Sequence, residues 1–193
     1  MYSLLFLLPF EVATAKNTIS TNLNLENTIN LGYKAGQGAN VELKHRNKYF
    51  GAKGYSTLTN EEKLKAENGY TYDIGVEIRA YLKDFFIALG KSYGGYKSTF
   101  SDGRVWEKSA HHTNYSIGYD RDSLEIILTY SNKENQTPNK REEISFFGEY
   151  RLPLKNNIII NIPVKLSIIR YDQSGKRMTG SSLSAGVGLK YEF

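Results

Sequence analysis

Much of the chain alternates between apolar and polar residues, and the clearest stretch is the last one. From residue 182 to 193 every second residue is apolar, and the residues between them are small or charged. Successive side chains of a β-strand point to opposite faces, so this pattern predicts a strand with one apolar and one polar face. Its apolar positions are Leu183, Ala185, Val187, Leu189, Tyr191 and Phe193.

Six earlier segments after residue 69 show the same period of two. Most are close to the roughly 9–11 residues that a tilted strand needs to cross a bilayer. They predict an all-β fold of antiparallel strands. The segments are 70–82, 85–90, 113–120, 124–131, 144–152 and 158–168.

The N-terminal third permits more than one strand count. Residues 29–35, 41–45 and 49–56 can be three strands, with Gly36-Gln37-Gly38 as a hairpin turn, which gives ten in all. One bent strand over 41–56 gives nine, and treating 29–35 as an extension as well gives eight. Because even counts are the rule in bacterial single-chain barrels, we predict ten strands, with eight as the alternative. The barrel then covers 28–193, and 16–27 form an N-terminal periplasmic segment.

The connections alternate between short and long. Tight turns are predicted at 46–48, 83–84, 120–122 and 153–156, and longer polar loops at 57–68, 94–111, 132–141 and 172–180. Short periplasmic turns with longer extracellular loops are typical of transmembrane up-and-down β-barrels. A soluble barrel or sandwich, the alternative, would turn its apolar face inward. Small residues on the charged face, such as Gly75, Ala88 and Gly118, favour placing that face in a narrow lumen.

Residues 1–15 have the pattern of a secretory signal peptide. A short apolar run over 4–10 is followed by Ala13-Thr14-Ala15, a small-x-small cleavage site. No Lys or Arg precedes the run, which departs from that pattern, and a buried N-terminal strand is the alternative.

Composition narrows the possible partners. The chain has no Cys, which excludes disulfides and thiolate metal sites. Its formal charge is +5, and loss of Glu11 with the signal peptide would make it +6. The charges are mixed in sign with no long basic run, so no nucleic-acid partner is predicted. Tyr outnumbers Trp by 15 to 1, and Tyr suits the boundary between acyl chains and headgroups.

The final strand ends in an aromatic-x-Phe pattern, Tyr191-Glu192-Phe193. Together with Leu189, this end resembles the C-terminal insertion signal of bacterial outer-membrane β-barrels. In overall pattern the chain resembles the OmpA transmembrane-domain and OmpX-like class. The resemblance implies the outer membrane of a Gram-negative bacterium, contact with its lipid and lipopolysaccharide, and insertion by the outer-membrane assembly machinery.

The polar faces of the strands carry charges of both signs, which the fold would enclose. An unpaired buried charge is costly, so these side chains are expected to pair and to fill a narrow lumen. A narrow or gated polar pore is the alternative. The predicted lumen charge network is Asp73, Glu77, Arg79, Glu149, Arg151, Lys165 and Lys190, with Lys34, Glu42, Lys44 and Glu192 on the same face.

Candidate catalytic residues are few. His111 and His112 follow Ser109, with Asp102 further back, so a Ser-His-Asp arrangement is conceivable. Thr113 and Asn114 follow His112, so the His-x-Ser pattern of the outer-membrane lipid A deacylases is absent, and no Asp–His pair resembles that of the omptin-type proteases. No enzyme, cofactor or metal site is predicted.

The remaining prediction concerns the loops. Trp106, the only tryptophan, lies in the longest predicted loop, where it could pack under that loop, dip into the lipid or anchor a partner. The predicted function is a structural envelope role or surface adhesion through the loops, with a host or cell surface as partner. A narrow channel and a lipid-modifying enzyme are the alternatives.

Overall fold

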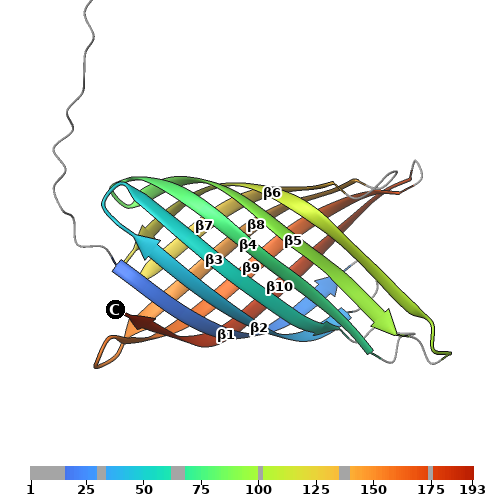
Figure 1. Cartoon of the computed structure of the whole chain (residues 1–193), viewed down its shortest axis with the longest axis horizontal. Coiled ribbons are helices and arrows are strands. Elements are labelled where there is room, and N and C mark those ends of the chain that lie inside the picture. Colours follow the sequence, from blue (N-terminus) through green and yellow to red (C-terminus); the bar gives the residue numbers. More distant parts are fainter. Residues whose placement is uncertain (1–15, 30–33, 62–67, 100–101, 135–139, 174–175) are drawn as a thin grey trace, which may run out of the picture.

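The computed structural model describes residues 16–29, 34–61, 68–99, 102–134, 140–173 and 176–193. These residues form ten antiparallel strands, each paired with its neighbours in sequence, and β1 also pairs with β10, so the sheet is a closed barrel (Figure 1). The strands are β1 Lys16–Ile29, β2 Lys34–Arg46, β3 Phe50–Glu61, β4 Asn68–Leu82, β5 Phe85–Thr99, β6 Val105–Arg121, β7 Leu124–Glu134, β8 Lys140–Pro153, β9 Ile158–Gln173 and β10 Lys176–Glu192.

The first strand corrects the prediction for the N-terminal region. Residues 16–27 are not a periplasmic segment but most of β1, in which Leu23 pairs with Ala39 on one side and Val187 on the other. Gly36-Gln37-Gly38 is not a turn but part of β2. The prediction overlooked a short alternation in this segment, in which Ile19, Leu23 and Leu25 share one face and the residues between them are polar. Backbone pairing on both sides supplies the hydrogen bonds that a barrel wall needs. The predicted signal peptide, 1–15, lies outside the described residues.

The connections at one end of the barrel, which we call the turn end, are all short. They cover 47–49, 83–84, 122–123 and 154–157, close to the predicted tight turns. Lys83, Asn156 and Asn157 adopt positive φ angles of 59°, 61° and 60° there. We call the opposite end the loop end.

The strands extend much further toward the loop end than predicted. Most of 94–111, predicted as a loop, is paired strand in β5 and β6, where Tyr96 lies opposite Lys108. Trp106 is accordingly a residue of β6 opposite Ser98, and its side chain lies outside the described part of the structure. The sequence did not predict these extensions because their residues are mostly polar. Backbone hydrogen bonds between strands form without an apolar face.

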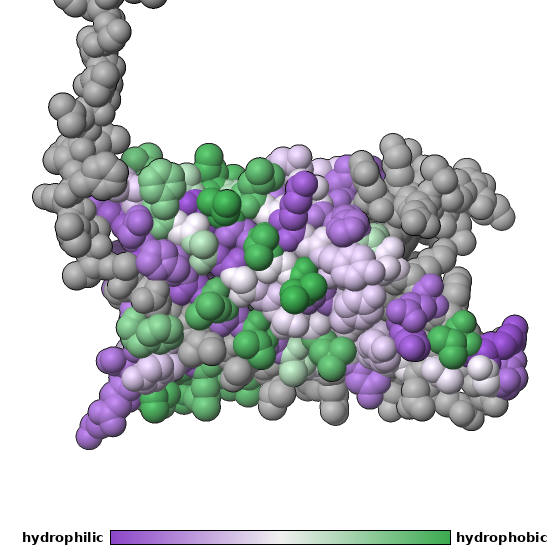
Figure 2. Space-filling view, viewed as in Figure 1, coloured by the Kyte–Doolittle hydropathy of each residue, from purple (hydrophilic) through white to green (hydrophobic). Residues whose placement is uncertain are grey.

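The apolar side chains point away from the lumen. Large hydrophobic residues on every strand from β2 to β10 are exposed, such as Ile78, Ile117 and Ile168, whereas most buried side chains are polar or charged. Figure 2 shows the apolar side chains mostly over the left and middle of the view, with hydrophilic side chains at both ends. Exposed apolar side chains exclude the soluble alternative, in which that face would be inside.

Aromatic side chains lie toward both edges of this apolar belt. Phe85 and Tyr119 are in edge contact near the turn end, with ring centroids 5.2 Å apart. Toward the loop end, Tyr72 and Tyr93 are 6.2 Å apart. Such girdles mark the two interfaces of a membrane-spanning barrel. The described residues contain no helix of the length and apolarity that would cross a membrane.

Candidate functional site

Eight charged side chains fill the lumen near the turn end, and we call them the lumen charge cluster. Each is at most 7% exposed. Alternation turns them inward, and strand register brings them to the same level. Four cations face four carboxylates, so the formal charges cancel. The cluster consists of Lys44 from β2, Glu77 and Arg79 from β4, Asp120 from β6, Glu125 from β7, Glu149 and Arg151 from β8, and Lys190 from β10.

Glu125 occupies the centre of the cluster. Its carboxylate accepts hydrogen bonds from Arg79 Nη1 at 2.5 Å and Lys44 Nζ at 3.2 Å. It also accepts one from Arg151 Nη2. One carboxylate therefore joins cations from three separate strands across the lumen.

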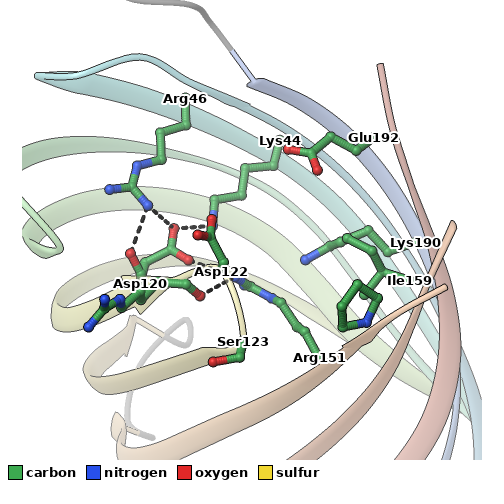
Figure 3. A pocket seen from close by; sticks show the side chains of 11 residues that line it. Lys44, Arg46, Asp120, Asp122, Ser123, Arg151, Ile159, Lys190 and Glu192 are labelled. Carbon is green, nitrogen blue, oxygen red and sulfur yellow. Dashed lines mark hydrogen bonds and ion pairs between the residues drawn. The ribbon is translucent and has the colours of Figure 1, made fainter. Parts of the chain in front are cut away.

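Asp120 forms a second junction, nearer the turn end. Its carboxylate accepts from Lys44 Nζ at 2.5 Å and from Arg151 Nη1 at 2.8 Å. The Tyr81 hydroxyl donates to the same carboxylate at 3.2 Å, and Arg46 Nη1 donates to its backbone oxygen at 2.7 Å. Figure 3 shows Arg46, Lys44 and Arg151 converging on this residue.

Glu77 and Glu149 complete the cluster on opposite walls. Arg79 Nε donates to Glu77 at 2.6 Å. Glu149 accepts from Arg151 Nε at 2.7 Å and Lys190 Nζ at 2.9 Å, and Asn161 Nδ2 donates to it at 3.0 Å. The network therefore crosses the lumen, as the contact between Lys44 of β2 and Glu125 of β7 shows. Burying ions costs free energy unless each is paired, and every member here has a partner of opposite charge.

Aromatic rings pack against the cluster. The Arg79 guanidinium lies 4.3 Å from the Phe86 ring centroid, and Arg46 lies 4.3 Å from that of Tyr81. The Phe86 ring covers Gly118, where an added Cβ would lie 2.5 Å from it. Small and large side chains thus interleave inside the barrel, as the glycines on the charged face predicted.

A cavity of about 220 Å³ opens at the turn end of the cluster (Figure 3). Lys44, Asp120, Arg151 and Lys190 line it. The cluster therefore closes the cavity toward the lumen. Its other lining residues are Arg46, Arg121, Asp122, Ser123, Pro153, Ile159 and Glu192.

The loop-end half of the lumen has a different lining. Its inward side chains are mostly small and polar, such as Ser92, Ser131 and Ser167. Lys165 alternates with buried residues of β9 and so faces inward, yet its side chain is 46% exposed while Nζ reaches Glu143 at 3.0 Å. An inward lysine with that exposure indicates open space in this half.

The structure separates the predicted charge network into two groups. It brings together Glu77, Arg79, Glu149, Arg151 and Lys190. Asp73 and Lys165 lie nearer the loop end, where His112 Nδ1 is 4.0 Å from Asp73 and Glu143 pairs with Lys165.

Two central carboxylates were missing from the prediction. Asp120 was read as part of a turn, and Glu125 was not singled out. The predicted strands 113–120 and 124–131 already placed both on the polar face, because Asp120 follows Ser116 and Gly118 there and Glu125 lies between the outward Leu124 and Ile126, but neither was assigned to the charge network.

The candidate catalytic residues do not meet. Ser109 faces outward and accepts a hydrogen bond from the Tyr93 hydroxyl at 2.7 Å. His111 also faces outward, His112 is buried in the lumen, and Asp102 pairs with Arg104 at 2.6 Å. Within the described ranges, no three His, Cys, Asp or Glu residues are grouped to hold a metal ion.

The C-terminal residues of the predicted insertion signal share the outward face of β10. Leu189, Tyr191 and Phe193 are 57%, 47% and 60% exposed. The Tyr191 and Phe193 rings are stacked with centroids 6.2 Å apart. They lie beside the seam with β1, where Tyr191 pairs with Ile19.

A closed antiparallel barrel with an apolar outer wall, two aromatic girdles and paired ions inside is a transmembrane β-barrel of the outer-membrane class. Its apolar wall is covered by the outer membrane, where such barrels reside. No family model and no curated protein sequence matches the chain.

Solved structures with a similar arrangement come from several bacteria. The β-domain of the Bordetella autotransporter BrkA is 12% identical, with 93% of this chain and 99% of that chain covered and a TM-score of 0.48. Neisserial surface protein A is 10% identical, with coverages of 93% and 97% and a TM-score of 0.46. Ail of Yersinia pestis is 12% identical, with coverages of 92% and 99% and a TM-score of 0.45.

Proposed function

We propose that this protein is a small outer-membrane β-barrel that conducts no ions and displays its loop-end strands at the cell surface, in a structural or adhesive role. The lumen charge cluster is the observation that carries this proposal. Arg79 and Asn161 have no exposed surface, and the cluster extends from one wall to the other. A lumen filled in this way supports the barrel wall and leaves no path for solutes.

In the proposed orientation the turn end faces the periplasm. Short turns lie on that side in barrels of this class. The start of β1 and the end of β10 also lie there. The β5–β6 hairpin then projects from the cell. Exposed pairs on it, Lys97 with Glu107 at 3.7 Å and Asp102 with Arg104 at 2.6 Å, give it a polar surface of mixed charge. A host surface or a neighbouring cell is the proposed partner.

Conductance across planar bilayers tests the closed lumen. The purified wild-type barrel is expected to produce no current steps. The double variant Lys190→Ser/Glu149→Ser removes a buried pair at 2.9 Å and is expected to leak, which shows that the assay detects an opening. Regular steps from the wild type would overturn the closed barrel and favour a narrow pore, for which the open space around Lys165 is the supporting observation.

Binding of intact cells to an epithelial surface tests the adhesive role. Cells that display the wild type are expected to bind more than cells carrying a variant whose residues 97–107 are replaced by a short Asn-Gly turn. The electrophoretic shift between unheated and boiled samples in SDS reports that both barrels are folded. Equal binding by these cells and by cells without the protein would contradict adhesion and leave the structural role.

We also propose that the protein is not an enzyme. The separation of Ser109, His112 and Asp102 supports this, since no described base contacts the serine. The lipid A mass profile is expected to be the same with and without the gene. A lost or gained acyl chain would contradict the proposal.

Recognition of the C-terminus by the assembly machinery is a further part of the proposal. Phe193→Ala is expected to lower the amount of folded barrel in the outer-membrane fraction several-fold. Phe50→Ala is the matched control. Phe50 is also an outward aromatic residue near the turn end, with 62% of its surface exposed, but it is far from the C-terminus in sequence. Equal loss in both variants would assign the effect to lipid contact alone.

A further inference from the structure

One lysine interrupts the apolar outer wall of β5. Lys91 is exposed and alternates with outward Leu89 and Tyr93. Its cross-strand neighbours are Val76 of β4, which is 63% exposed, and Thr113 of β6. The residue therefore lies inside the belt that faces lipid, below the loop-end aromatic residues.

A lysine at this position is costly in an apolar environment. On the lipid face of a barrel it destabilises by about 2–4 kcal/mol at the bilayer midplane and by about 0–1 near an interface. The described part of the chain gives Lys91 no carboxylate partner. A charged residue inside a membrane segment therefore points to a ligand or a pathway.

Polar side chains continue from Lys91 toward the loop end. Tyr93 donates to Ser109 Oγ at 2.7 Å, and its ring lies 5.1 Å from that of His111, its cross-strand partner. Thr113 lies between His111 and Tyr115 on the same outward face. We call Lys91, Tyr93, Ser109, His111 and Thr113 the β5–β6 strip.

Another part of the wall shows that this strip is not a general feature of the barrel. Along β8 and β9 the outward residues Ile144, Phe146, Leu166 and Ile168 are all apolar and exposed. Polar side chains return only at Glu142 and Arg170, which pair with each other at 3.6 Å.

We propose that the β5–β6 strip binds the phosphorylated headgroup of a lipid A-type glycolipid in the outer leaflet. The Lys91 stem lies along the apolar wall while its ammonium reaches up toward the phosphate. Tyr93, Ser109 and His111 offer hydroxyl and imidazole groups to the sugar to which the phosphate is attached. The leaflet assignment rests on the proposed orientation, in which the loop end faces outward.

A second copy of the chain fits the strip less well. Symmetric pairing would need a carboxylate opposite Lys91, and the strip has none. Glu107, the next acidic residue along β6 toward the loop end, already pairs with Lys97. Charge complementarity therefore favours an anionic lipid.

Native mass spectrometry of the barrel released from nanodiscs tests the proposal. The discs contain phosphatidylcholine alone, phosphatidylcholine with phosphorylated lipid A, or phosphatidylcholine with phosphatidylglycerol. The wild type is expected to retain lipid A selectively. Lys91→Met is expected to lower this retention about tenfold, the equivalent of roughly 1.4 kcal/mol in affinity.

Lys155→Met is the matched control and is expected to retain lipid A like the wild type, because Lys155 is exposed in a turn outside the belt. Lys91→Met removes a charge from lipid, so it is expected to fold, and the heat-dependent shift in SDS verifies this. Unchanged retention in Lys91→Met would overturn the site. Equal retention of phosphatidylglycerol by the wild type would overturn the glycolipid assignment.

Both leaflets of a nanodisc carry the lipid, so orientation, conductance and adhesion do not affect the result. A failed conductance or adhesion test would therefore leave the lipid site standing, and a failed lipid test would leave the closed barrel standing.

Discussion

The two halves of the lumen are built from the same alternation but filled differently. At the turn end, six strands contribute four long cations and four carboxylates, and the ions reach one another across the lumen. At the loop end the inward residues include several serines, and Lys165 and Asp73 are partly exposed at 46% and 33%. One half is closed by paired ions, and the other leaves room for water.

The difference between the two halves indicates that side-chain length and strand register decide whether a polar lumen is closed. A polar inward face is common to both halves and does not distinguish them. Closure needs long side chains of opposite sign on facing strands at one level, as Lys44 of β2 and Arg79 of β4 meet Glu125 of β7.

Removing the Arg79 guanidinium has the largest expected effect. Arg79→Ala leaves Glu77 and Glu125 buried with less positive charge and is expected to destabilise the barrel by about 3–5 kcal/mol. Urea-induced unfolding in lipid vesicles, followed by Trp106 fluorescence, measures this. If Arg79→Ala lowered the free energy of unfolding no more than Lys165→Ala in the loop-end half, the contrast between the two halves would be contradicted.

A double-mutant cycle on Glu149 and Lys190 sharpens the same contrast. Each single variant, Glu149→Leu or Lys190→Met, leaves a charge without its partner at 2.9 Å. The double variant is expected to be more stable than the sum of the single losses by about 1–3 kcal/mol. Strict additivity in urea unfolding would show that the two ions do not act as a pair.

Packing at the turn end gives a smaller effect. Gly118→Ala places a Cβ 2.5 Å from the Phe86 ring and is expected to cost about 1–3 kcal/mol. Gly54→Ala is the matched control and is expected to be nearly neutral, because nothing lies within 4 Å of its added Cβ. Thermal midpoints of the shift in SDS compare the two. Equal midpoints for Gly118→Ala and Gly54→Ala would show that the Phe86 side chain can move to accommodate the added Cβ.

The smallest effect is expected in the loop-end half. Lys165→Ala removes a partly solvated pair worth less than about 1 kcal/mol, because water screens the charges. Glu143 keeps a hydrogen bond from Ser167 at 3.0 Å. Urea unfolding under the conditions used for Arg79→Ala measures the change. A loss of several kcal/mol would show that this half is as closed as the other.

The sequence predicted best where one face had to be apolar. Alternation in 182–193 gave the outward face of β10, and the same logic placed Arg79, Arg151 and Lys190 inside. It failed for the strand ends near Trp106, because backbone pairing continues where both faces are polar. In β1 the prediction overlooked an alternation that the sequence does carry, in Ile19, Leu23 and Leu25. Asp120 was missed because a residue beside a turn resembles any polar turn residue, and only its partners from other strands reveal its role.

Accessibility of single cysteines tests the central claim most directly, because the native chain has none. Ser184→Cys lies on the inward face of β10 in the loop-end half, and Asn161→Cys lies against the lumen charge cluster. A small membrane-impermeant thiol reagent added to intact cells is expected to label the first and to spare the second until the protein is boiled. Rapid labelling of both would contradict a lumen closed at the turn end.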